Sequence, residues 1–89
     1  MDYDAELTLI TRQGCHLCEE ASNDLARLVA RFSALYPDKP YAVEVLDVDS
    51  DSALQRKYSE EVPVLLLNGK QVSFFKIDVD RVLALMEKL

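Results

Sequence analysis

Two cysteines, Cys15 and Cys18, stand three positions apart in this chain and form a Cys-x-x-Cys motif. They follow a run with strand periodicity and open a run with helical periodicity, so both should lie on one face of the first helical turn. The Cα atoms of such a pair are about 5 Å apart, within the range that a disulfide requires. We therefore expect the two thiols to be able to form a disulfide without a backbone movement.

The expected position of Cys15 at a helix start favours its ionised form. Unpaired N–H groups stabilise negative charge there, so the pKa of the Cys15 thiol should lie below that of a free cysteine. Arg12 and a protonated His16 would add to this effect, and the two glutamates after Cys18 would oppose it only weakly through solvent. We predict that Cys15 attacks a disulfide and that Cys18, one turn further in, resolves the mixed disulfide.

His16 lies between the two cysteines and has two interpretations. It could carry protons, or its protonation could tune the redox couple, and we favour the second role. A zinc site formed with Cys15 and Cys18 would need a fourth ligand, and the chain has no further cysteine or histidine. We therefore expect no metal site within one chain; only oligomerisation could complete one.

Composition and charge narrow the function. The 89 residues, 49% of them hydrophobic, suit one core and one domain spanning residues 1–89. The net charge of −6 argues against nucleic acid and anionic membranes as partners. No apolar stretch approaches the roughly 18 residues of a membrane span, and the acidic start is unlike a signal peptide. We expect a cytoplasmic protein, where a Cys-x-x-Cys motif is more often catalytic or metal-binding than structural.

The first half of the chain predicts two strands and two helices. Strand periodicity covers residues 5–11 and 41–47, and between them a helical apolar stripe occupies residues 17–35 and ends before a proline. Cap-type side chains at residues 49–51 precede a short helix. We interpret the acidic residues around this segment as solvated loop and helix-start groups.

The second half predicts a hairpin and a final helix. A continuous apolar run at residues 62–67 is typical of a buried strand, and the Asn-Gly pair after it is a strong hairpin signal. In the returning strand we expect Phe74 to pack in the core and Phe75 to be exposed at an edge. Asp78 is a suitable N-cap for the last helix.

The element order is therefore β-α-β-α-β-β-α. It predicts an α/β protein with a four-stranded mixed sheet and helices on both faces, the first two strands being parallel through a right-handed crossover. This order, with Cys-x-x-Cys between the first strand and the first helix, resembles the thioredoxin-like fold over nearly the whole chain. The glutaredoxin branch of that superfamily is the most similar.

Further residues carry the resemblance to glutaredoxins. Arg12 matches a basic residue three positions before the first cysteine, and Val62-Pro63 matches a Val-Pro pair that opens the third strand. The resemblance implies that Pro63 is cis and lies beside the active cysteine, with the backbone of Val62 free to pair with a bound peptide or glutathione. Together with Arg12, His16 and Asp78, these residues form the predicted substrate- or glutathione-binding set.

Two departures from glutaredoxins bear on this set. The family usually has Gly-Gly and an acidic residue after the fourth strand to hold glutathione, whereas this chain reads Ser-Phe-Phe-Lys-Ile-Asp over residues 73–78. Asp78 could cap the amine of a ligand, but an N-cap is its simpler role. His16-Leu17 also differs from the Pro-Tyr of typical glutaredoxins and the Gly-Pro of thioredoxins.

The resemblance and the thiol chemistry predict a thiol-disulfide oxidoreductase. It would reduce disulfides of a protein or a small molecule through a mixed disulfide, without a tightly bound cofactor, and glutathione or a thioredoxin-type reductase would recharge it. One alternative is an iron-sulfur or metal carrier in which Cys15 of two subunits bridges a [2Fe-2S] cluster. Another is a non-catalytic binding module that holds a partner through Val62 and the edge formed by Phe74 and Phe75.

Overall fold

The computed structural model describes residues 4–89; residues 1–3, which begin the acidic N-terminal stretch, lie outside the described part. The elements follow the predicted order: β1 Ala5–Thr11, α1 His16–Leu35, β2 Tyr41–Asp47, the short 3-10 helix η1 Val48–Ser50, α2 Ser52–Tyr58, β3 Val64–Leu67, β4 Lys70–Phe74 and α3 Val79–Glu87. None of the helices within residues 4–89 combines the length and the apolar character needed to cross a membrane.

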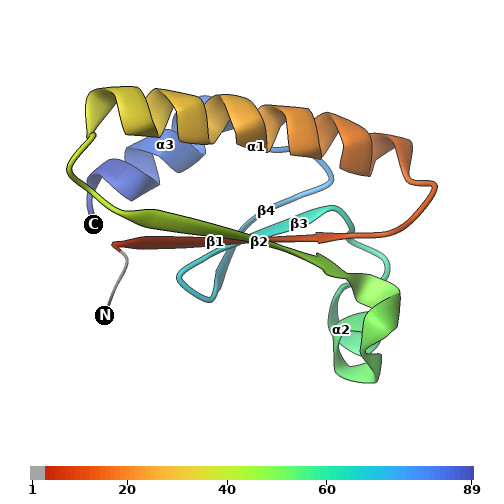
Figure 1. The fold of residues 1–89 in the computed structure, drawn as a ribbon. Coiled ribbons are helices and arrows are strands. Elements are labelled where there is room, and N and C mark those ends of the chain that lie inside the picture. Colours follow the sequence, from red (N-terminus) through yellow and green to blue (C-terminus); the bar gives the residue numbers. More distant parts are fainter. Residues whose placement is uncertain (1–3) are drawn as a thin grey trace.

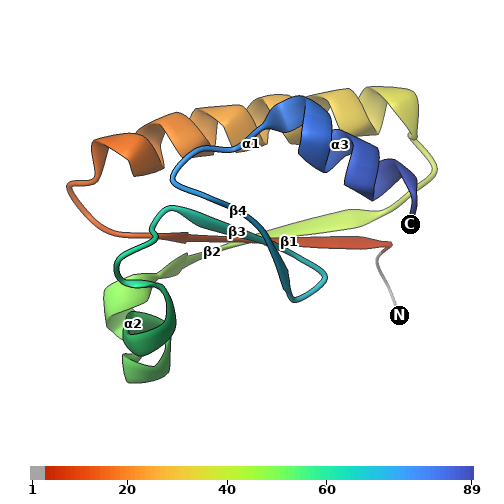
Figure 2. The ribbon, with the colours of Figure 1, turned by 180° about the vertical axis from the view of Figure 1, so that it is seen from behind.

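The four strands form one mixed sheet in the order β2-β1-β3-β4. β1 is parallel to β2 and antiparallel to β3, and β3 is antiparallel to β4. The register pairs Thr11 with Asp47 and Ile10 with Val64. The ends of β1, β2 and β4 and the start of β3 therefore lie at the same end of the sheet (Figures 1 and 2). This topology confirms the predicted fold class.

Helices cover the two faces of the sheet unequally (Figures 1 and 2). α1 and α3 lie side by side over one face, whereas α2 lies at one end of the other face. The main core lies between α1, α3 and the sheet and consists of Ala5, Leu7, Leu9, Ala21, Leu25, Leu28, Phe32, Leu65, Leu67, Ile77, Val82, Leu83 and Met86. A smaller core on the α2 side contains Ile10, Val48, Tyr58 and Val64.

The apolar stripe of α1 is narrower than the sequence suggests. Its buried members run from Cys18 to Phe32, but Leu17 and Leu35 at the two ends are 44% and 56% exposed. Both lie about 80° around the helix from Leu25 at 3.6 residues per turn, so they miss the buried face. Leu17 is thus an exposed apolar side chain beside the cysteines.

The prediction that Phe74 packs in the core was wrong, since this side chain is 52% exposed. A register irregularity between Leu65 and Leu66 places one extra residue, Val72, in β4. Val72 still packs against the main core, but Phe74 pairs with Val64, whose side chain belongs to the opposite face. A bulge shifts the alternation of side chains by one residue, and at this edge strand α2 does not cover the ring.

The predicted hairpin turn is confirmed. Asn68 has a φ of 50° and Gly69 a φ of 84°, the two positive values that a two-residue type I′ turn requires. The turn is also attached to β1, because the Asn68 amide donates to the Glu6 carbonyl at 2.8 Å and the Glu6 amide donates to Asn68 Oδ1 at 2.8 Å. These bonds fix the register of the hairpin against the central strand.

Candidate active site at the start of the first helix

The two cysteines meet where β1 passes into α1. Gly14 has a φ of 72°, a left-handed conformation that suits glycine, and turns the chain into the helix. Cys15 is the N-cap residue of α1, and its Sγ accepts a hydrogen bond from the Cys18 amide at 3.1 Å. The two residues form a disulfide with their Cα atoms 5.1 Å apart. The predicted compatibility of this pair with a disulfide is therefore confirmed.

The two sulfurs differ in accessibility. Cys15 is half-buried at the open end of the helix, whereas Cys18 is 5% exposed and belongs to the buried stripe. A hollow of about 200 Å³ beside them is lined by Thr11, Arg12, Gly14, Cys15, Cys18, Glu19 and Ser22. Cys15 is therefore the more accessible of the two sulfurs, and Cys18 lies behind it within bonding reach.

The segment before β3 lies at the same end of the sheet. The Val62–Pro63 peptide bond is cis, as the resemblance implied, and Pro63 is buried. β3 begins at Val64, two residues later than predicted, because proline has no N–H for the ladder. Since Ile10 pairs with Val64, Thr11 lies opposite Pro63. Within residues 4–89, neither the N–H nor the C=O of Val62 has a hydrogen-bond partner.

Arg12 forms an ion pair within the chain that was not predicted from the sequence. Its Nε and Nη2 donate to the two carboxylate oxygens of Asp49 at 3.1 and 3.2 Å, and its Nη1 donates to the Ser59 carbonyl at 3.2 Å. The hydrogen bond from Arg12 lowers the pKa of Asp49, with a second contribution from Gln55. The same bond raises the pKa of Arg12. This ion pair connects the loop before Cys15 to η1 and α2, and it reduces the charge that Arg12 offers to a thiolate.

Two neighbouring acids of this segment cap helices, and the cap role of Asp51 was predicted. Asp47 accepts a hydrogen bond from the Asp49 amide at 2.9 Å and caps η1. Asp51 accepts one from the Ala53 amide at 2.7 Å and caps α2. Only Asp49 departs from the prediction, because its partner Arg12 lies 37 residues earlier in the chain. No local pattern signals such a contact.

The ion pair of Arg12 and Asp49 predicts a pH dependence of stability. Folding lowers the pKa of Asp49 from its ordinary value of 3.8, so the pair stabilises the fold above about pH 4 and stops doing so as the pH falls through the lowered pKa. Asp49→Asn removes this proton linkage. Urea unfolding between pH 6 and 3 should therefore show a steeper acid loss of stability for the wild type than for the variant. Equal slopes would contradict a linkage through Asp49.

His16 is the first residue of α1 and is directed into solvent. Its side chain is 83% exposed, and its Nδ1 lies 3.9 Å from Glu19 Oε2. His16 follows Cys15 directly in the sequence, but its side chain does not line the hollow beside the two cysteines. Among residues 4–89, no group of three or more histidine, cysteine, aspartate or glutamate side chains is placed to hold a metal ion.

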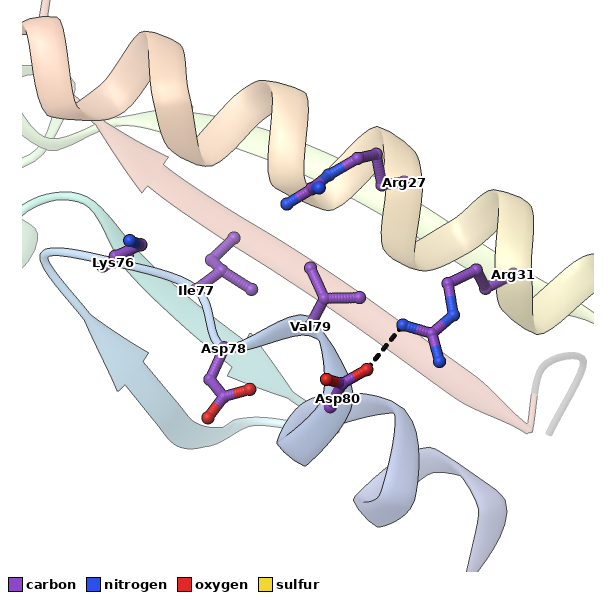
Figure 3. Close-up of a pocket in the computed structure, with 7 residues that line it drawn as sticks. All are labelled: Arg27, Arg31, Lys76, Ile77, Asp78, Val79 and Asp80. Atoms are coloured by element: carbon purple, nitrogen blue, oxygen red, sulfur yellow. Dashed lines mark hydrogen bonds and ion pairs between the residues drawn. The ribbon is translucent and has the colours of Figure 1, made fainter.

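Asp78 is the N-cap of α3, and its Oδ1 accepts a hydrogen bond from the Arg81 amide at 3.2 Å. Figure 3 shows its carboxylate turned away from Arg31, which pairs with Asp80 at 2.6 Å. The hollow drawn there measures about 530 Å³ and is lined by Arg27, Arg31, Lys76, Ile77, Asp78, Val79 and Asp80. Arg27 follows Cys15 by 12 residues, which is about 18 Å along a helix. This larger hollow is therefore not at the cysteines.

Phe75 occupies the region where the predicted family has Gly-Gly. Its φ of 63° is left-handed, a conformation that is unfavourable for a bulky residue. Its amide donates to the Pro63 carbonyl at 2.8 Å and, less closely, to the Glu61 carbonyl at 3.4 Å. The chain between β4 and α3 is thereby attached to the cis-proline segment. This conformation could not be predicted from the residue type, because glycine is the residue that usually marks it.

Comparison with known proteins agrees with this geometry. Residues 6–87 match the family described as Glutaredoxin-like domain (DUF836). An uncharacterised protein of Mycobacterium tuberculosis, Rv0508, is 27% identical over 79 residues, which cover 89% of this chain and 79% of that protein.

Solved structures extend the comparison. A structural-genomics target from X. campestris is 28% identical, covers 93% of this chain and 97% of its own, and superposes with a TM-score of 0.65. A mutant thioredoxin from Halobacterium salinarum is 27% identical, with 98% and 75% coverage and a TM-score of 0.61. Such a fold with a linked Cys-x-x-Cys pair supports a role of the thiol oxidoreductase type. The chain belongs to the glutaredoxin-like domain family of the thioredoxin superfamily.

Proposed function

We propose that this protein is a thiol-disulfide oxidoreductase that reduces the disulfides of a protein or small-molecule substrate. The observation that carries the proposal is the pair of unequal sulfurs: a half-buried Cys15 that caps α1 and a buried Cys18 within disulfide distance of it. In the reduced protein, the N–H of Cys18 that now points at Cys15 Sγ would stabilise a thiolate there. An extended substrate would pair with the backbone of Val62, whose N–H and C=O have no hydrogen-bond partner within residues 4–89.

The reaction consists of two thiol-disulfide exchanges. The Cys15 thiolate attacks one sulfur of the substrate disulfide, so the substrate S–S bond breaks, a Cys15–substrate bond forms, and the leaving sulfur takes up a proton. Cys18 then loses its proton and attacks Cys15 Sγ, which releases the second substrate thiol and forms the Cys15–Cys18 bond. The substrate gains two electrons and two protons, and the protein loses them.

A thiol donor must restore the reduced pair after each turnover. We propose two glutathione molecules or the dithiol of a thioredoxin-type reductase, since either supplies two electrons and two protons by the same exchange chemistry. No tightly bound cofactor is required, because the two sulfurs hold the electrons themselves. We propose the cytoplasm as the site of action because thiol pools keep cysteine pairs reduced there.

The proposal is tested by reduction of insulin disulfides with dithiothreitol as the donor. Catalytic amounts of the wild type should accelerate the reaction well above the rate with dithiothreitol alone. A Cys15→Ser/Cys18→Ser double variant, shown to be folded by circular dichroism, should give no acceleration. If the wild type and this variant are equally inactive with insulin and with glutathione disulfide, the protein is not a disulfide reductase and the binding-module alternative is favoured.

A further inference from the structure

Two aromatic side chains are exposed next to the cis-proline segment. Phe74 is 52% exposed and Phe75 is 44% exposed, and their ring centroids lie 5.0 Å apart in an edge-to-face arrangement. Large apolar side chains that adjoin one another on a surface mark binding sites more often than single ones do. We refer to Phe74 and Phe75 together as the aromatic pair.

The backbone fixes the aromatic pair against the site. Phe74 pairs with Val64, the first residue of β3, and the Phe75 amide donates to the Pro63 carbonyl at 2.8 Å. Phe75 adopts a left-handed φ of 63° at a position where glycine or asparagine would be less strained. Local stability therefore does not explain a phenylalanine there, and strained residues of this kind cluster at functional sites.

The aromatic pair lies within reach of a peptide that is bound at Cys15. β1, β3 and β4 are neighbours in that order, so the end of β4 is about 10 Å from the end of β1 at the usual strand spacing. An extended peptide covers this distance in about three residues. A substrate strand pairing with the free backbone of Val62 would thus hold its half-cystine near Cys15 and a flanking side chain near Phe74 or Phe75.

The charges at this end of the sheet favour an apolar peptide over glutathione. Glutathione has two carboxylates and one amine, but Arg12 is already bound to both carboxylate oxygens of Asp49. Two acids, Glu60 and Glu61, directly precede Val62, one base, Lys76, directly follows Phe75, and the whole chain carries a net charge of −6. An anionic tripeptide is repelled by such a surface, whereas an apolar side chain is not.

We propose that the aromatic pair selects protein disulfides whose half-cystine is flanked by an apolar residue, in preference to glutathione disulfide. The inference rests on the proposed function and names its substrate class. The flanking side chain is buried against the two rings while Cys15 attacks the neighbouring sulfur. The exchange chemistry itself is unchanged.

The kinetic test compares three substrates: two disulfide-linked peptide dimers and glutathione disulfide. The two peptides differ only in the residue before cysteine, which is leucine in one and serine in the other. Burial of one leucine side chain predicts a kcat/KM about 10-fold higher for the leucine peptide. Phe74→Ser/Phe75→Asn should abolish this preference, since asparagine tolerates the left-handed φ. Val45→Ser, at a 59% exposed valine on the opposite edge strand β2, should retain it. Equal rates for both peptides with the wild type would overturn the inference.

A binding measurement separates the inference from the proposed function. Peptides with serine in place of cysteine cannot exchange, so their affinity for the oxidised protein reports docking alone. In a titration followed by NMR, the amide resonances of Val62 and Phe75 should change their chemical shifts. The peptide without leucine should bind about 10-fold more weakly. Selective binding without any turnover would refute the proposed reductase and leave the docking site standing. Turnover without selectivity in either measurement would refute the docking site and leave the reductase standing.

A stability measurement excludes a purely structural role for Phe75. Glycine adopts its φ of 63° without strain, so Phe75→Gly should unfold within a few degrees of the wild type while it loses part of the preference for leucine. A large fall in unfolding temperature, as expected for a core phenylalanine, would show that Phe75 serves mainly to pack the fold and would overturn its assignment to the aromatic pair.

Discussion

Cys15→Ser should abolish disulfide reduction, whereas Cys18→Ser should preserve the first exchange and accumulate a mixed disulfide. The two variants differ because only Cys15 lies at the open end of α1, while Cys18 is buried one turn further in. Loss of an attacking nucleophile costs an enzyme more than about 10³-fold in rate, the largest effect expected for any side chain here. Without Cys18, no protein thiol is placed to release the substrate from Cys15.

The two variants are compared with a peptide disulfide as the substrate and mass spectrometry as the readout. The Cys18→Ser variant should form a mixed disulfide between Cys15 and one half of the peptide disulfide, which adds the mass of that half. Dithiothreitol should reduce this bond and remove the added mass. Cys15→Ser should stay unmodified over the same time, because its remaining thiol is 5% exposed. If Cys18 proved to be the sulfur that captures the peptide, the assignment of attacking and resolving thiols would be reversed.

Phe32→Ala should cause the largest loss of stability. Phe32 is fully buried in the main core, and its ring centroid lies 5.5 Å from that of Tyr36 and 6.2 Å from that of Tyr41. Removal of a buried phenylalanine ring costs about 3–5 kcal/mol in transfer free energy and cavity formation. Small domains have a total free energy of unfolding of only about 5–15 kcal/mol, so the variant should be near its stability limit.

Phe74→Ala is the matched control for Phe32→Ala, because it makes the same chemical change at a ring that is 52% exposed. Surface substitutions usually alter stability by no more than about 0.5 kcal/mol, and we expect a loss near that size. Urea unfolding of both variants provides the comparison. Similar losses at the two positions would mean that the sheet face under α1 and α3 is not the main source of stability.

The elements and their order could be predicted because they depend on local patterns. The alternation in β1, the stripe in α1 and the Asn68-Gly69 turn each specify one conformation within a few residues. The cis bond before Pro63 came from the family resemblance, because only about 5–6% of X-Pro bonds are cis and the local sequence does not distinguish them.

The remaining features depend on tertiary contacts. Arg12 meets Asp49 only after β1 and β2 have paired, so spacing along the chain does not reveal the ion pair. The bulge at Val72 changes which face Phe74 occupies, and a shift of one residue cannot be seen in a short strand of mixed composition. The left-handed Phe75 contradicts its own backbone preference, as residues at functional sites often do.

The central claim is that Cys15 and Cys18 form one reversible dithiol-disulfide couple. It is tested most directly by equilibrating the reduced protein with glutathione buffers of graded potential and measuring both thiols by alkylation and mass. We predict a single two-electron transition to a monomer that has lost two hydrogen atoms, with the link between Cys15 and Cys18. A protein that stays reduced across the whole range, or that forms only mixed or intermolecular disulfides, would contradict the account.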